Sequence, residues 1–80
     1  MMDIKVLGTG CAKCGTLESA TRKATEELNL DVTIEKVEDI IEIMNYGIMR
    51  TPGLVINGKV VVSGQVPKMS KLKEILTQNK

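Results

Sequence analysis

Two cysteines, Cys11 and Cys14, are the residues of this chain best suited to chemistry. They follow a short apolar run and two glycines, and they precede a long segment whose apolar residues recur at helical spacing. That order predicts a strand, a tight loop and the start of a helix. Residues three apart at a helix start lie on one face, with Cα atoms about 5–6 Å apart, which is within reach of a disulfide.

The start of a helix also favours ionisation of the first thiol. The unpaired N–H groups of the first turn and the positive end of the helix dipole both stabilise a thiolate. Lys13 lies between the two cysteines and adds a cation. The pattern therefore predicts a dithiol that cycles between a reduced and an oxidised form.

Two other interpretations of the cysteine pair must be weighed. Free cysteine often packs as a small buried hydrophobe, but the flanking glycines and Lys13 favour exposure here. The same two thiolates could instead carry Cu(I) or another soft metal. A closed structural zinc site needs four cysteine or histidine ligands, whereas the chain has two cysteines and no histidine. The lack of histidine also excludes histidine-based catalysis.

Length and composition limit the other function classes. Eighty residues predict one domain, residues 1–80, with a largely aliphatic core because Tyr46 is the only aromatic residue. A net charge of +1 indicates neither nucleic-acid binding nor attraction to an anionic membrane. The apolar runs are too short to span a membrane and the first residues do not resemble a signal peptide, so we expect a cytoplasmic monomer.

Hydrophobic periodicity and turn residues predict the order βαβαββα. A right-handed crossover makes the first two strands parallel, and a hairpin adds two antiparallel strands. We therefore expect an α/β fold with a mixed four-stranded sheet, strand order 2-1-3-4, and helices on both faces. The expected strands are 3–7, 31–37, 54–56 and 59–62, and the expected helices are 11–28, 39–48 and 67–77.

Two of these elements carry specific packing expectations. Asn57-Gly58 between two β-rich runs predicts a type I′ hairpin, and the uninterrupted apolar run 54–56 predicts a strand covered on both faces. The second helix is expected to bury one side. That side is formed by Ile40, Ile41, Met44 and Ile48.

Cys11-Ala12-Lys13-Cys14 at a helix start, followed by Thr51-Pro52 before a hairpin, resembles the thioredoxin/glutaredoxin superfamily. The chain looks most like the minimal thioredoxin-like, redox-active disulfide proteins of archaea and bacteria. The resemblance implies a thiol–disulfide oxidoreductase in which Cys11 is the nucleophile and Cys14 the resolving thiol. It also implies that Pro52 is a cis-proline facing them. The supporting residues would be Gly10, Ala12, Lys13, Thr51 and Pro52.

The same resemblance implies the partners of the chain. It predicts no cofactor beyond the redox-active Cys11–Cys14 disulfide. The partners would be a disulfide-bearing protein substrate and a reductase, as suits electron transport and cell redox homeostasis.

Lys5 marks one difference from thioredoxins. Thioredoxins carry a buried aspartate six residues before the first cysteine, and this chain has Lys5 at that position. One interpretation is a strand lysine that extends its amine into water. The other is an amine beneath the active site that tunes the cysteine pKa.

Overall fold

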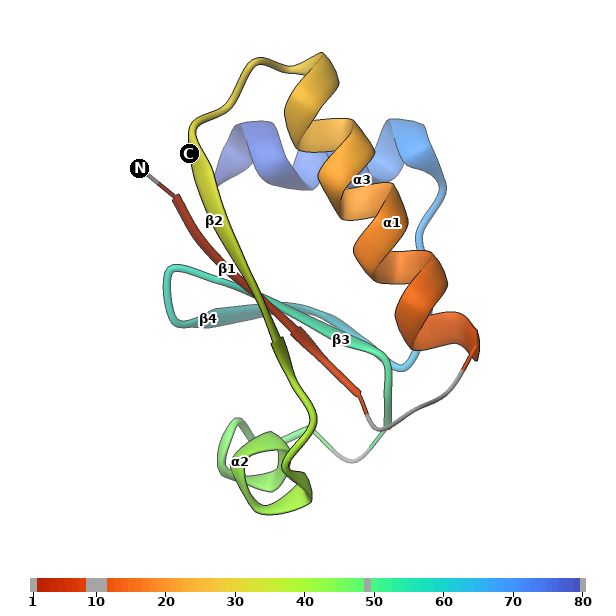
Figure 1. The fold of residues 1–80 in the computed structure, drawn as a ribbon, viewed down its shortest axis with the longest axis vertical. Helices are drawn as coiled ribbons and strands as arrows, with labels where there is room; N and C mark the ends of the chain where they lie inside the picture. The colour runs from red at the N-terminus through yellow and green to blue at the C-terminus, as the bar shows by residue number, and fades with distance from the viewer. Residues whose placement is uncertain (1, 9–11, 49, 80) are drawn as a thin grey trace.

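The computed structural model describes residues 2–8, 12–48 and 50–79, and Figure 1 shows their arrangement. Within these ranges the chain folds in the predicted order βαβαββα. The strands are β1 (Met2–Leu7), β2 (Val32–Val37), β3 (Gly53–Ile56) and β4 (Lys59–Ser63), and the helices are α1 (Ala12–Glu27), α2 (Ile40–Asn45) and α3 (Met69–Gln78).

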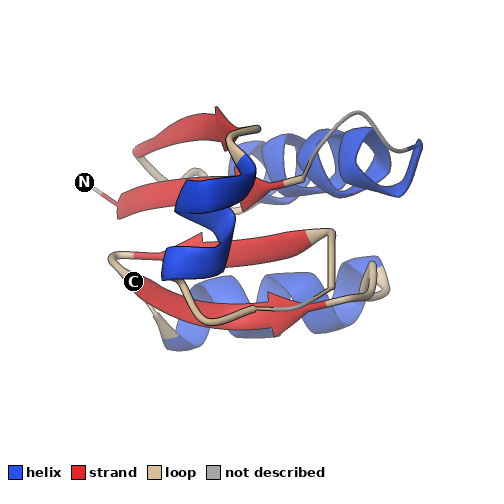
Figure 2. Ribbon diagram, turned by 90° about the horizontal axis from the view of Figure 1, so that it is seen from below, coloured by secondary structure: helices blue, strands red, loops and turns tan. Residues whose placement is uncertain are grey.

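The four strands form one mixed sheet in the order β2-β1-β3-β4, which confirms the predicted topology. Strand β1 runs parallel to β2 and antiparallel to β3, and β3 pairs antiparallel with β4. Figure 2 shows two helices on one side of the strands and a short helix on the other. The expected α/β architecture with helices on both faces is therefore present.

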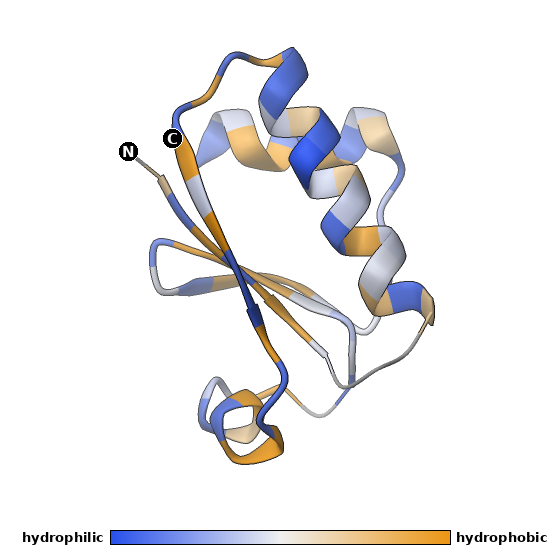
Figure 3. Ribbon diagram, in the orientation of Figure 1, coloured by the Kyte–Doolittle hydropathy of each residue, from blue (hydrophilic) through white to orange (hydrophobic). Residues whose placement is uncertain are grey.

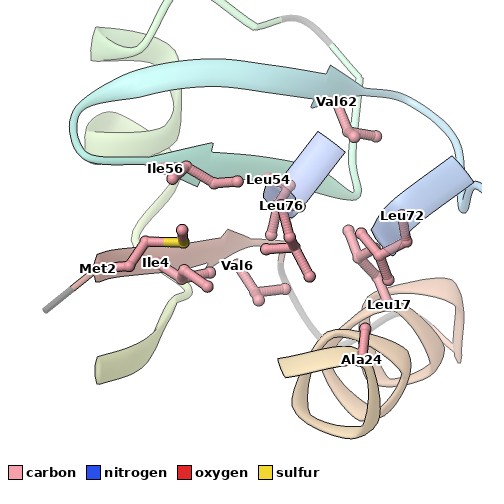
Figure 4. Packing of buried hydrophobic residues seen from close by; sticks show 10 residues of the cluster. All are labelled: Met2, Ile4, Val6, Leu17, Ala24, Leu54, Ile56, Val62, Leu72 and Leu76. Carbon is pink, nitrogen blue, oxygen red and sulfur yellow. The ribbon is translucent and has the colours of Figure 1, made fainter. Parts of the chain in front are cut away.

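Each face of the sheet has its own hydrophobic cluster. The larger one joins α1 and α3 to the sheet, as Figure 4 shows for ten of its side chains. The smaller cluster lies on the α2 side and contains Leu7, Val37, Ile43, Ile48 and Val55. Alternate residues of β1 point to opposite faces, so this one strand supplies both clusters.

Strand β3 and its hairpin agree with the sequence analysis. All four residues of β3 are buried, as expected for a strand covered on both faces. The turn residues Asn57 and Gly58 have φ of 51° and 84°. Positive φ at both central residues is the signature of a type I′ turn.

The predicted buried side of α2 is wrong for three of its four residues. Ile40, Ile41 and Met44 are 62%, 66% and 66% exposed, and apolar residues colour the outer side of α2 in Figure 3. Ile43 is the residue of this helix that is buried, at 4% exposure. Ile48 is buried as expected, but it lies beyond the end of the helix.

The reason for this error is the shortness of the helix. Asp39 caps its start by accepting a hydrogen bond of 2.9 Å from the backbone N–H of Ile41, and Tyr46 caps its end, so α2 has only six residues. Apolar residues occupy most positions of such a short helix, and their spacing does not select one face. The cap and the loops at both ends decide which residue turns toward the sheet.

The first prediction compares two isoleucines of α2. Ile43→Ala should lower the free energy of unfolding by about 2–4 kcal/mol, because it leaves a cavity under the helix. Ile41→Ala, the matched control, should change it by less than about 0.5 kcal/mol, because the side chain is mostly in water already. Urea unfolding of both variants measures the difference, and equal losses would contradict the observed rotation of α2.

The second prediction concerns the ion pair between Glu27 on α1 and Lys73 on α3. A hydrogen bond from the Lys73 amine, then its charge, holds the pKa of Glu27 below its ordinary value of 4.5. The pair therefore stabilises the fold above that value and loses its effect as the pH falls through the lower folded pKa. Lys73→Met should be less stable than the wild type at pH 6, and the two should converge at pH 2. A stability difference that stayed constant between these pH values would contradict this assignment.

Candidate active site at the ends of β1 and α1

The loop before β3, the end of β2 and the first turn of α1 meet at the end of β1. Leu7 pairs with Gly53, so the loop that precedes β3 comes alongside the residue that follows β1. That residue, Gly8, donates a backbone hydrogen bond of 3.0 Å to the carbonyl oxygen of Val37. A Cβ atom built on Gly8 would lie 2.8 Å from the Cβ atom of Cys14 and 3.9 Å from that of Thr51.

Cys14 is the predicted site residue that the structure describes most fully. It lies in the first turn of α1, is fully buried and is disulfide-bonded. Burial excludes bulk water and large reagents from its sulfur. Ala12 and Lys13, which precede it, are exposed. The predictions for Gly10 and Cys11 concern residues that lie outside the described ranges.

The Thr51–Pro52 loop forms the other side of the site. The peptide bond between these residues is cis, as the resemblance predicts. Pro52 is buried whereas Thr51 is exposed. The Pro52 carbonyl oxygen accepts a 2.8 Å hydrogen bond from the backbone N–H of Gly64, and this bond anchors the loop to the residue that follows β4.

Lys5 lies on the face of the sheet that α2 covers. It is half-buried and lines a pocket of about 250 Å³ together with side chains from β2 and α2. The other lining residues are Glu35, Val37, Glu42, Asn45 and Tyr46. Tyr46 first, by charge and by a side-chain hydrogen bond, and then the carboxylates of Asp3 and Glu35 raise the pKa of Lys5 above 10.5.

This arrangement separates Lys5 from the neighbourhood of Cys14. The Lys5 amine interacts with Tyr46 on the α2 side, whereas Cys14 belongs to α1 on the opposite side. A role for Lys5 in tuning the thiols stays a prediction. Neither the interaction of Lys5 with Tyr46 nor the contact between Gly8 and Cys14 could be predicted from the sequence. Both depend on how separate elements pack, although the short Gly-x-Gly loop is a signal for close approach.

Among residues 2–8, 12–48 and 50–79, no cluster of three or more histidine, cysteine, aspartate or glutamate residues could hold a metal ion. The helices in the described part of the chain are too short or too polar to span a bilayer.

The third prediction tests the interaction of Lys5 with Tyr46. Tyr46→Phe removes the phenolic oxygen, so the pKa of Lys5 should fall toward 10.5 while remaining raised by Asp3 and Glu35. Titration of the lysine ε-carbon by NMR measures this pKa directly. Lys59 is a matched reference in the same spectra, because it is exposed on β4. A Lys5 pKa unchanged by the substitution would show that Tyr46 is not its main partner.

Comparison with known proteins identifies the family of this chain. The family model described as a thioredoxin domain matches residues 2–77. A thioredoxin of Methanothermobacter thermautotrophicus is 38% identical over 77 residues, which cover 96% of this chain and all of that protein. A thioredoxin of Methanocaldococcus jannaschii is 38% identical over 76 residues, covering 95% of this chain and 87% of the relative.

Solved structures agree with this result at the level of the fold. A mutant thioredoxin from Halobacterium salinarum superposes with a TM-score of 0.75 at 20% identity, covering 98% of this chain and 74% of its own. The thioredoxin Deadhead of Drosophila melanogaster gives a TM-score of 0.69 at 13% identity, covering 96% and 79%. With a family match over nearly its whole length and two close archaeal relatives, the chain belongs to the thioredoxin family.

Proposed function

We propose that this protein is a thiol–disulfide oxidoreductase that uses Cys11 and Cys14 as its redox couple. The observation that carries the proposal is a disulfide-bonded, buried Cys14 in the first turn of α1, packed against Gly8, which itself approaches Thr51. Membership of the thioredoxin family supports the same class of reaction. The chain has two cysteines, so Cys11 is the partner that we propose for Cys14.

The reaction begins with the reduced pair. The Cys11 thiolate attacks one sulfur of a target disulfide and forms a mixed disulfide, while the second target sulfur leaves as a thiolate and takes up a proton. Cys14 then loses its proton and attacks the Cys11 sulfur. The remaining target sulfur is released, and a Cys11–Cys14 bond forms. The target gains two electrons and two protons, and an external dithiol or a reductase supplies them to the chain for the next cycle.

Burial supports the division of labour between the two cysteines. A thiolate is costly in an apolar environment, so burial disfavours ionisation of the reduced Cys14. Cys14 therefore waits as a thiol until a mixed disulfide forms beside it. Cys11 precedes the first described turn of α1, and the N–H groups and dipole of that helix would favour its thiolate.

The exposed Thr51 offers a place for the target protein. A peptide that adds as a short strand beside this loop would gain main-chain hydrogen bonds, a common mode of peptide recognition. Gly8 approaches both Cys14 and Thr51, so such a strand would bring its disulfide close to the cysteine pair. We propose a protein disulfide as the substrate and a separate reductase as the electron donor.

The fourth prediction assigns the two roles by substitution. Cys14→Ser should still attack insulin disulfides and accumulate a mixed disulfide through Cys11, whereas Cys11→Ser should form none. Both variants should lose turnover, so insulin reduction should fall to the rate of dithiothreitol alone. Non-reducing electrophoresis with mass spectrometry measures the adducts, and the turbidity of reduced insulin measures turnover.

Alkylation of the reduced wild type at pH 7 is an independent control. Cys11 should react faster than Cys14, because a thiolate is the reactive form. Adducts through Cys14, or faster alkylation of Cys14, would reverse the assignment. Wild-type protein that binds Cu(I) tightly and does not reduce insulin would overturn the proposed function altogether.

A further inference from the structure

Gly8 is a glycine for a reason other than its backbone conformation. The glycines with positive φ in the described part of the chain are Gly47, Gly58 and Gly64, and Gly8 is not among them. The φ angle of Gly8 therefore lies outside the left-handed region that favours glycine. The atoms packed around Gly8 must therefore be what excludes a side chain at this position.

Cys14 occupies the space that a side chain at position 8 would need. A Cβ atom built on Gly8 would overlap the Cys14 Sγ atom and lie 2.8 Å from the Cys14 Cβ atom. Gly53 is also crowded, but the nearest atom there is the flexible end of the Ile48 side chain. The sulfur of Cys14 is held by its disulfide and by α1, so it has less freedom to move.

We infer that Gly8 is a positioning residue for the redox disulfide, because its bare Cα lets the Cys14 sulfur pack against the end of β1. This inference rests on the proposed function. In the oxidised form the sulfur is bonded, and a methyl group at position 8 would push it out of place. In the reduced form the thiol can rotate about χ1 and relieve most of that overlap.

A methyl group at position 8 must therefore destabilise the oxidised form more than the reduced form. The reaction concerned is the uptake of two electrons and two protons by the disulfide, which gives two thiols. Gly8→Ala should shift its equilibrium toward the dithiol at least about tenfold, which corresponds to a rise of about 30 mV in reduction potential for a two-electron couple. Loss of packing alone, equal in both forms, would leave the potential unchanged.

Gly15 provides a matched control in the same region of the chain. It is next to Cys14 in α1, and a Cβ atom built there would meet no atom within 4 Å. Gly15→Ala adds the same methyl group and should leave the equilibrium within about twofold of the wild type. Its helix should be slightly stabilised, because alanine favours a helix more than glycine does.

The experiment equilibrates the wild type and both variants with mixtures of oxidised and reduced dithiothreitol. Acid quenching, alkylation and mass spectrometry then give the fraction of dithiol at each ratio. A shift toward the dithiol in Gly8→Ala alone supports the inference. An unchanged equilibrium, a shift toward the disulfide or an equal shift in Gly15→Ala overturns it. A wild type that shows no reversible disulfide would instead contradict the proposed function.

A second pair of variants covers the case in which Gly8→Ala does not fold. Cys14→Ala removes the sulfur, so adding Gly8→Ala to this background should cost much less stability than it costs in the oxidised wild type. Urea unfolding of the four proteins measures this coupling. If the added methyl group is equally destabilising with and without the sulfur, Cys14 is not the reason for the glycine.

Discussion

The antiparallel pairing of β1 with β3 is the constraint on which the rest of the molecule depends. These two strands are the centre of the sheet; β3 is buried along its whole length, and β1 is buried at four of its six residues. Their register aligns Leu7 with Gly53. It therefore places the residue after β1 beside the Thr51–Pro52 loop, although more than forty positions separate them in the chain. The site exists because this register is held by hydrophobic burial on both faces.

The helices cover the two faces of the sheet to different extents, and the less covered face leaves apolar side chains exposed to water. Helices α1 and α3 cover one face with a large cluster that includes Leu17 and Leu72. The buried side of α1 also contains Thr21, whose hydroxyl donates a 2.7 Å hydrogen bond to the Leu17 carbonyl oxygen and so satisfies its polar group. Helix α2 covers the other face with little more than Ile43, and it leaves Ile40, Ile41 and Met44 largely in water.

The cysteine site lies on the well-packed face of the sheet, where the sulfur of Cys14 is fully buried. Cys14 is held at zero exposure by α1 and by the close approach of Gly8, in a place where a thiolate is disfavoured. Lys5 sits on the other face with Tyr46 and several carboxylates, which hold its amine in the charged form. The two faces thus keep a disulfide-forming sulfur and a cluster of charges apart, on opposite sides of a single sheet.

The sequence by itself determined the element order, the sheet topology and the type I′ hairpin. The element order and the hairpin follow from local rules, because alternation, helical spacing and an Asn-Gly turn act between residues close in the chain. The sheet topology follows from the general handedness of crossover connections. The Cys-x-x-Cys motif and Thr51-Pro52 were equally visible as local patterns. The family resemblance that they carry agrees with the match over residues 2–77.

Only the tertiary structure decided the rotation of α2, the partner of Lys5 and the reason for Gly8. A six-residue helix with apolar residues around most of its surface has no preferred buried side until its cap and loops are placed. Tyr46 reaches Lys5, and Cys14 reaches Gly8, only after helices pack on the sheet. Such contacts join residues that are distant in sequence or lie on different elements. Local propensity carries no information about them, because packing of the whole core sets which surfaces meet.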